Sequence, residues 1–230
     1  MILFDDRIRK KYHPGKIIFQ GADVSIESGL TYLLFGDNGS GKSTLLRILA
    51  QDESYIRFRF NDQPQPNFRY RPDQVSYMQS DLVFYRSMKV TDLFRFHRDL
   101  DRRFDAMYAD DALTKFQIDR TAKIVSLSDG QRKLVNFILC MARRCDLYLI
   151  DEPFPNVDLK NIEKCVRMII DRQSLETTFV IATHQIGEVE TIADHILWIR
   201  HQDIINESAD TLRDETARSV ESNYRRDSPC

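Results

Sequence analysis

Residues 32–44 read Tyr-Leu-Leu-Phe-Gly-Asp-Asn-Gly-Ser-Gly-Lys-Ser-Thr, an apolar run that leads into a glycine-rich loop. The apolar run Tyr32–Phe35 predicts a buried strand, and the apolar positions between Leu45 and Leu49 predict a helix directly after the loop. The loop fits the pattern G-x-x-x-x-G-K-[ST], in which glycines let successive backbone amides converge on one anion at a helix N-terminus. The segment therefore predicts a strand, a phosphate-binding loop and a helix.

The side chains of this loop suit a nucleotide that carries several phosphates. Lys42 is expected to reach the β- and γ-phosphates, and the hydroxyl of Ser43 is expected to hold Mg²⁺. The residues that we expect around the phosphates are Gly36, Asp37, Asn38, Gly39, Ser40, Gly41, Lys42, Ser43 and Thr44.

A second apolar run, Leu147–Ile150, ends in two adjacent carboxylates, Asp151 and Glu152. Open α/β sheets bind ligands outside the carboxyl ends of their strands, where these two side chains would lie. Because consecutive strand residues point to opposite faces, the chain must leave the strand at this dipeptide if both carboxylates serve one site. Pro153 favours an end of the strand at this point.

Another anion-binding segment precedes a predicted helix from about Gln131 to Arg144. Residues 127–131 read Leu-Ser-Asp-Gly-Gln, so they place backbone amides and a helix dipole at a second helix N-terminus. One chain does not need two phosphate-binding segments for one nucleotide.

Two further polar residues complete a recognisable series. His184 follows the predicted strand Phe179–Ala182, and Gln79 ends the predicted strand at 74–78. In order and spacing, the phosphate-binding loop, Gln79, the segment 127–131, the carboxylates and His184 resemble the ABC ATPase family over about residues 1–205. The chain looks most like the ATP-binding subunits of small bacterial exporters, which are encoded apart from their membrane subunits.

The resemblance implies catalytic and metal-binding roles, with ATP and Mg²⁺ as the bound groups. Glu152 would polarise the water that attacks ATP, His184 would contact the γ-phosphate and Gln79 would sense that phosphate. Asp151 would hold Mg²⁺ through water, with Ser43 and Gln79 as further metal-binding residues.

The resemblance also implies contacts on the adenine and across a dimer. Tyr12 would stack on the adenine, while Ser128, Gly130 and Gln131 would face the γ-phosphate held by the opposite subunit. Two ATP molecules would then be sandwiched head to tail between two copies of this chain, or between it and a paralogous ATPase subunit. Asp158 would communicate across that dimer.

Two positions depart from the pattern of the family. Asp129 stands where a second glycine is usual, and its carboxylate either points outward or weakens closure of the dimer. The segment Phe154–Val157 replaces the small residues that usually precede the aspartate at 158. Both departures concern communication across the dimer, whereas the catalytic residues match the pattern.

A membrane partner is expected to be a separate chain. The longest apolar runs fall well short of the roughly 20 residues that cross a bilayer. The resemblance therefore implies a cytoplasmic protein, held on the inner face of the membrane by separately encoded membrane-spanning subunits. The apolar stretch Asp81–Tyr85 either receives such a subunit or packs against a helical insertion.

Apolar strands that alternate with helices predict a parallel sheet covered on both faces. The expected fold class is α/β, a P-loop NTPase core with a parallel sheet, an antiparallel β subdomain and a small helical subdomain. We expect an ATPase domain at 1–205, a helical insertion at about 88–125 and a polar C-terminal tail at 206–230. Further expected elements are helices at 159–173 and near 186–193 and a strand at 196–199.

Residues 55–60 alternate between two faces, with Ile56, Phe58 and Phe60 on one face and Tyr55, Arg57 and Arg59 on the other. The pattern fits a half-buried antiparallel strand, and it also fits a surface on which arginines and aromatic rings bind nucleic acid. The chain has 33 basic and 35 acidic side chains among 230 residues, a net charge of −2. This balance gives no general field that attracts nucleic acid, so no nucleic-acid partner is expected.

Two other functions fit the same motifs. The first is a soluble ABC-type ATPase that works in assembly or repair and has no transport role. The second is a module that binds ATP and scarcely hydrolyses it, although Glu152 and His184 argue against it. The four cysteines, at 140, 145, 165 and 230, lack the paired spacing of a metal site and fit a reducing compartment.

Overall fold

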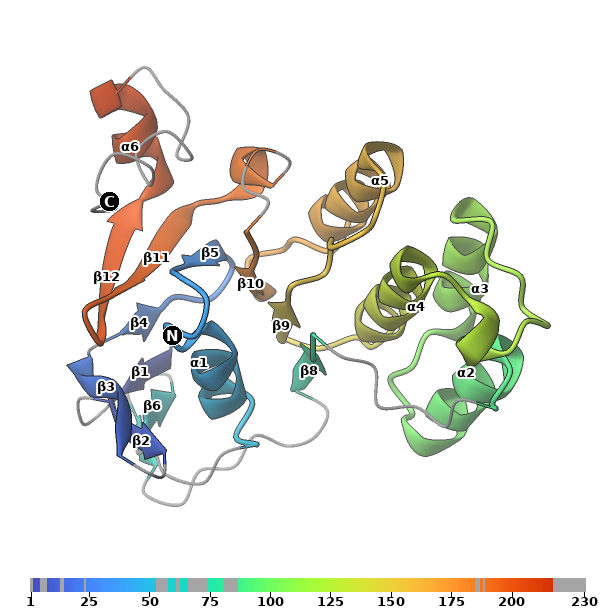
Figure 1. Ribbon diagram of the computed structural model, residues 1–230, viewed down its shortest axis with the longest axis horizontal. Helices are drawn as coiled ribbons and strands as arrows, with labels where there is room; N and C mark the ends of the chain where they lie inside the picture. The colour runs from blue at the N-terminus through green and yellow to red at the C-terminus, as the bar shows by residue number, and fades with distance from the viewer. Residues whose placement is uncertain are drawn as a thin grey trace.

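A six-stranded sheet with the order β12-β11-β5-β10-β9-β8 lies at the centre of the molecule (Figure 1). The structure is a computed structural model that describes residues 2–4, 8–12, 15–22, 24–52, 58–60, 63–65, 74–80, 87–184, 187 and 189–216. Five strands of this sheet are parallel, and β12 (Asp203–Ser208) pairs antiparallel with β11 at one edge. The parallel strands are β5 (Thr31–Phe35), β8 (Val75–Met78), β9 (Leu147–Asp151), β10 (Thr178–Ala182) and β11 (His195–Arg200).

Helices cover both faces of this sheet, which explains why every residue of β5, β9 and β10 is buried. Leu34 and Leu149 belong to one apolar cluster with α1, while Leu33 and Ile150 belong to a second cluster with α4 and α5. The side chains of successive residues in one strand thus pack into the apolar clusters on opposite faces of the sheet. These helices are α1 (Lys42–Leu49), α4 (Asp129–Met141) and α5 (Leu159–Ile170).

Two smaller groups of strands are entirely antiparallel, as the predicted β subdomain requires. One sheet has the order β4-β1-β6-β7, and β2 pairs with β3 as a hairpin. The strands are β1 (Ile2–Phe4), β2 (Ile8–Tyr12), β3 (Lys16–Ala22), β4 (Ser25–Ile26), β6 (Phe58–Phe60) and β7 (Gln63–Gln65). The predicted antiparallel strand is thus found at 58–60, and the rest of it, at 55–57, lies outside the described residues.

The predicted helical insertion forms α2 (Val90–Leu100), α3 (Ala106–Lys115) and the 3-10 helix η1 (Ile124–Ser126). Asp105 caps α3 by accepting a hydrogen bond from the Tyr108 amide at 3.0 Å, and it pairs with Arg144 at 2.7 Å. The amide and the guanidinium together lower the pKa of Asp105. Arg103 donates to the carbonyl of Arg144 at 3.4 Å.

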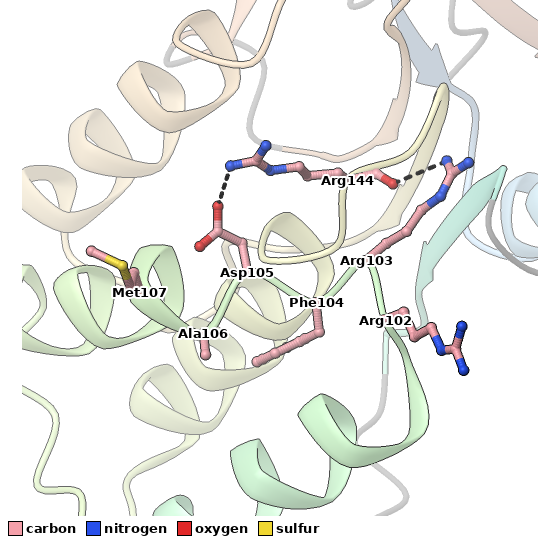
Figure 2. Close-up of a pocket in the computed structure, with 7 residues that line it drawn as sticks. All are labelled: Arg102, Arg103, Phe104, Asp105, Ala106, Met107 and Arg144. Carbon is pink, nitrogen blue, oxygen red and sulfur yellow. Dashed lines mark hydrogen bonds and ion pairs between the residues drawn. The ribbon is translucent and has the colours of Figure 1, made fainter.

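These contacts form part of the wall of a cavity of about 490 Å³ (Figure 2), which is lined by Arg102, Arg103, Phe104, Asp105, Ala106, Met107 and Arg144. They attach the turn between α2 and α3 to the segment that links α4 to β9. None of the predicted site residues lines this cavity, so we interpret its ion pair as structural.

Two helices have boundaries that differ from those expected, α4 at both ends and α5 at its C-terminal end. Helix α4 begins at Asp129, because Ser128 accepts a hydrogen bond from the Gln131 amide while the Gln131 side chain accepts one from the Ser128 amide. It ends at Met141 rather than at Arg144, since Arg143 forms a β-bridge with Phe104. Helix α5 ends at Ile170 rather than at 173.

The expected polar tail at 206–230 begins too early. All six residues of β12 pair with β11, and the helix α6 (Ala209–Thr216) follows directly. Arg213 fixes this helix by donating to the carbonyls of Glu190 and Ala193. Because one face of an edge strand is exposed, such a strand carries many polar residues. The polar composition of β12 therefore led to the prediction of a tail at this point. Residues 217–230 lie outside the described residues.

The predicted short helix near 186–193 is represented by the 3-10 helix η2 (Glu190–Ile192), while Ile186 and Glu188 lie outside the described residues. Within the part of the chain that the structure describes, no helix is both long enough and apolar enough to cross a membrane.

The correction at β12 can be tested with two neighbouring isoleucines. Ile204 is 7% exposed and packs into the α1 core, whereas Ile205 points away and is 45% exposed. Ile204→Ala should lower the free energy of unfolding by about 2–5 kcal/mol, because it leaves a cavity in that core. Ile205→Ala should lower it by about 0.5 kcal/mol or less. Urea denaturation measures both, and equal small effects would contradict a packed β12.

Candidate active site

A cavity of about 350 Å³ lies where the glycine-rich loop meets the carboxyl ends of β9 and β10. The residues that line it come from the β2–β3 hairpin, the loop, α1, and the segments after β8, β9 and β10. They are Tyr12, Lys16, Ile18, Asn38, Gly39, Gly41, Lys42, Ser43, Thr44, Arg47, Ser80, Asp151, Glu152 and His184. Ten of the predicted site residues therefore share one cavity, although they come from distant parts of the sequence.

The loop leaves the N-terminus of α1 open to a ligand. Gly41 occupies the N-cap position with a left-handed φ of 118°, and no side chain in the described part of the chain caps the helix. A Cβ atom on Gly41 would lie 2.4 Å from Ile18 Cγ2, so only glycine fits between the loop and β3. The uncapped amides and the absence of acidic residues in the first turn suit an anion.

Lys42 is the buried cation of the site. Its Nζ donates to the carbonyls of Gly36 at 2.7 Å and Asp37 at 3.3 Å, and lies 3.1 Å from His184 Nε2. Burial lowers the pKa of Lys42, while the charges of Glu152 and Asp151 oppose that change. Gly36 and Asp37 thus take part through their carbonyls, which hold the ammonium group inside the loop.

Asp151, the last residue of β9, is only 2% exposed. Burial raises the pKa of this carboxyl, against a hydrogen bond from Ser43 and the charge of Lys133. Its Oδ1 has no hydrogen-bond partner among the described residues. Because an unpartnered buried oxygen is costly, Asp151 and Ser43 fit the needs of a hard cation such as Mg²⁺.

Glu152 directs its carboxylate at His184. Its φ is +46°, and its amide donates to the carbonyl of Ala182 at 2.8 Å, so the chain leaves β9 at this residue, as the dipeptide required. Oε2 accepts from the amide of His184 at 3.3 Å, and Oε1 lies 3.2 Å from His184 Nε2. Burial raises the pKa of Glu152, and the charges of His184 and Lys42 oppose the rise.

The remaining predicted residues around the nucleotide differ in their positions. Tyr12 lines the cavity, and its hydroxyl lies 3.5 Å from Thr44 Oγ1. Ser40 does not line the cavity, and its amide donates to the Asp37 carbonyl at 3.0 Å. The side chain of Gln79 is exposed and outside the cavity lining, while its carbonyl accepts from Asn136 Nδ2 at 2.9 Å.

The segment Ser128–Gln131 does not line the cavity of its own chain. Asp129 is exposed and pairs with Arg132 of the same helix, which matches the first of its two expected orientations. Gly130 is buried, and a Cβ atom on it would lie 2.2 Å from the carbonyl oxygen of Asn156. This contact ties the segment to the residues that follow the carboxylates.

The structure explains two residues of the unusual segment Phe154–Val157, which precedes Asp158. Phe154 is fully buried in the α4–α5 core, and Asn156 adopts a left-handed φ of 61° that asparagine tolerates. Asp158 caps α5 by accepting from the Asn161 amide at 3.0 Å.

Sequence reasoning missed four residues that line the cavity, namely Lys16, Ile18, Arg47 and Ser80. Two signals were available. Arg47 lies one turn after Ser43 on α1 and donates to its carbonyl at 3.4 Å, and Ser80 directly follows Gln79. Lys16 lies opposite Tyr12 across the β2–β3 hairpin, a pairing that only the fold reveals.

Solved structures of similar fold are ATP-binding cassettes. One described as the ATP binding subunit of an ABC transporter has a TM-score of 0.81 at 17% identity, covering 98% of each chain. A dimeric cassette, MJ0796, bound to ADP and Pi has a TM-score of 0.77 at 18% identity, covering 91% of this chain and 99% of that one. These likenesses confirm the predicted fold class.

Two curated relatives are ATP-binding proteins of transporters. The ABC transporter ATP-binding protein YtrB of Bacillus subtilis is 26% identical, covering 87% of this chain and 70% of the relative. The molybdate import ATP-binding protein MolC of Haemophilus influenzae is 29% identical, covering 83% and 76%. The family model described as ABC transporter matches residues 19–155, more than half of the chain. The chain therefore belongs to the ABC transporter family, among its ATP-binding ATPase subunits.

Proposed function

We propose that this chain is the ATP-hydrolysing motor subunit of a membrane ABC transporter and works as a head-to-tail nucleotide-sandwich dimer. The observation that carries this function is the arrangement of Lys42, Glu152 and His184. All three meet in one cavity at the open N-terminus of α1, with atoms 3.1–3.2 Å apart around His184 Nε2. A cation, a base and a proton-bearing ring at a phosphate-binding loop suit hydrolysis of a terminal phosphate.

ATP would bind with its phosphates along the loop and its adenine against Tyr12. The amides of Asn38, Gly39 and Gly41 and the ammonium of Lys42 would hold the β- and γ-phosphates. Ser43 and Asp151 would hold Mg²⁺, with Gln79 as a further ligand, and the metal would neutralise part of the phosphate charge.

Glu152 would position and deprotonate the water that attacks the γ-phosphorus. The bond from the γ-phosphorus to the bridging oxygen then breaks, and ADP and phosphate are formed. Because burial raises the pKa of Glu152, its carboxylate is a stronger base than an exposed one. A positioned base contributes about 10²–10⁴-fold, or about 3–5 kcal/mol of barrier lowering. The amide of His184 fixes the direction of that carboxylate.

A second subunit would complete the site. Ser128, Gly130 and Gln131 do not line the cavity of their own chain, and we propose that they close on the γ-phosphate bound by the opposite subunit. ATP then links the two subunits, and hydrolysis releases them. The partner subunit is a second copy or a paralogous ATPase subunit.

Membrane-spanning subunits encoded separately would receive this motion, with the chain on the cytoplasmic face of the membrane. The stretch Asp81–Tyr85, which we expected to contact them, lies outside the described residues. The names of YtrB and MolC support a transport role, and one of the two names specifies import. The predicted likeness to small exporters stays a prediction, and so does the soluble assembly or repair ATPase as the alternative.

Substitution of Glu152 tests the proposed base. Glu152→Gln should bind ATP and form the dimer but hydrolyse ATP at least about 100-fold more slowly, because the amide cannot accept the proton. Phosphate release and the mass of the protein with ATP measure both properties. Glu163→Gln, on the exposed side of α5, serves as the matched control and should hydrolyse ATP normally. Fast hydrolysis by Glu152→Gln would remove this residue from its role.

The raised pKa of Glu152 has a consequence for stability. Since the folded-state pKa lies above the unfolded value, the ionised carboxylate lowers the stability of the ligand-free protein at neutral pH. Glu152→Gln should therefore raise Tm at neutral pH. The gain should shrink as the pH falls through the raised pKa, where the wild-type carboxyl becomes neutral. Glu163→Gln should show no such gain, and an unchanged or lower Tm for Glu152→Gln at neutral pH would contradict the buried charge.

A further inference from the structure

Helix α4 holds the chain segment that carries Gln79. Asn136 lies in the middle of α4 among apolar residues, is 9% exposed, and donates from Nδ2 to the carbonyl of Gln79 at 2.9 Å. Lys133, one turn earlier, donates to the carbonyl of Ser80. Positions three apart lie on one face of a helix, so two side chains from the same face of α4 donate to the consecutive carbonyls of Gln79 and Ser80.

These two carbonyls need partners outside the sheet. Among the described residues, β8 is an edge strand whose one neighbour is β9, and its ladder ends at Met78 opposite Ile150. Gln79 and Ser80 follow that end, where no strand in the described part of the chain supplies an amide. Burying the side-chain amide of Asn136 costs free energy unless that amide is hydrogen-bonded. The bond to the carbonyl of Gln79 offsets this cost.

The same helix begins with the outward-facing segment Ser128–Gln131. We infer that Asn136 and Lys133 are positioning residues, which hold Gln79 and Ser80 in a fixed relation to this segment through the body of α4. Contact of the segment with a second subunit is thereby coupled to the position of Gln79 at the first. This inference rests on the proposed hydrolysis of ATP by a dimer.

Asn136 is the better of the two residues for a test. It does not line the cavity, so it can act on the reaction only through the residues that it positions. Lys133 is less clean, because its positive charge also acts on the carboxyl of Asp151. Loss of Asn136 should therefore lower kcat and leave ATP affinity nearly unchanged.

A double-mutant cycle between Asn136 and Gln79 separates positioning from simple structural support. Asn136→Ala should reduce kcat about threefold to tenfold, the effect of one lost hydrogen bond, and change the Kd for ATP less than twofold. In a Gln79→Ala background the same substitution should reduce kcat less than twofold, because the residue that it positions is gone. Asn136→Leu, which keeps the number and branching of the side-chain heavy atoms but removes the donor, should behave in the same way.

Ser76→Ala provides the matched control. Ser76 of β8 donates to the carbonyl of Cys140 at 2.9 Å, so it joins the same strand to the same helix without touching Gln79. This variant and Asn136→Ala should both lower Tm, because each removes a buried hydrogen bond, but the effect of Ser76→Ala on kcat should be small and independent of Gln79→Ala.

Two results would overturn the positioning role while leaving ATP hydrolysis intact. One is an equal loss of kcat from Asn136→Ala with and without Gln79, and the other is the same coupling for Ser76→Ala. No change in kcat for Gln79→Ala would also overturn it. A wild-type protein that binds no ATP with magnesium would contradict the proposed function itself, so the two failures are distinguishable.

Discussion

The buried ammonium group of Lys42 controls the charge of the whole site. It bonds to the carbonyls of the loop and lies beside His184. Its charge opposes the effect of burial on the pKa of Asp151, together with Lys133, and on that of Glu152, together with His184. Burial lowers its pKa and raises the pKa of both carboxyls, so the three charges depend on one another. In the function proposed above, a nucleotide would bring negative charge and its metal positive charge to this group.

Much of this site could be predicted from sequence because its parts are local. The strand–loop–helix order at 32–49 fixed the phosphate-binding loop, and the turn at Asp151–Glu152 followed from strand geometry alone, since both side chains had to serve one face. The left-handed φ of Glu152 is the structural solution. Local patterns also gave the parallel sheet, because fully buried strands are continuous apolar runs.

What sequence could not give depends on long-range pairing. Lys16 enters the cavity through its place opposite Tyr12, and β12 is a strand because β11 supplies its ladder. The exposed side chain of Gln79 and the contact of Gly130 with Asn156 likewise depend on how α4 packs. Composition shows only that each of these residues is polar or small. It does not show which residues lie beside each of them in the folded chain. For that reason the tail boundary was wrong while the core strands were right.

The most direct test of a site built from two chains mixes two inactive variants. Lys42→Ala should disable the loop, and Ser128→Arg should block the segment that we propose faces the opposite subunit. In a mixed dimer, one of the two sites combines an intact loop from one copy with an intact Ser128 from the other. We predict that ATP hydrolysis, nearly absent in each variant alone, returns to a measurable fraction of the wild-type rate on mixing. Hydrolysis by Ser128→Arg alone at the wild-type rate, or no recovery in a mixture shown to contain mixed dimers, would contradict the shared site.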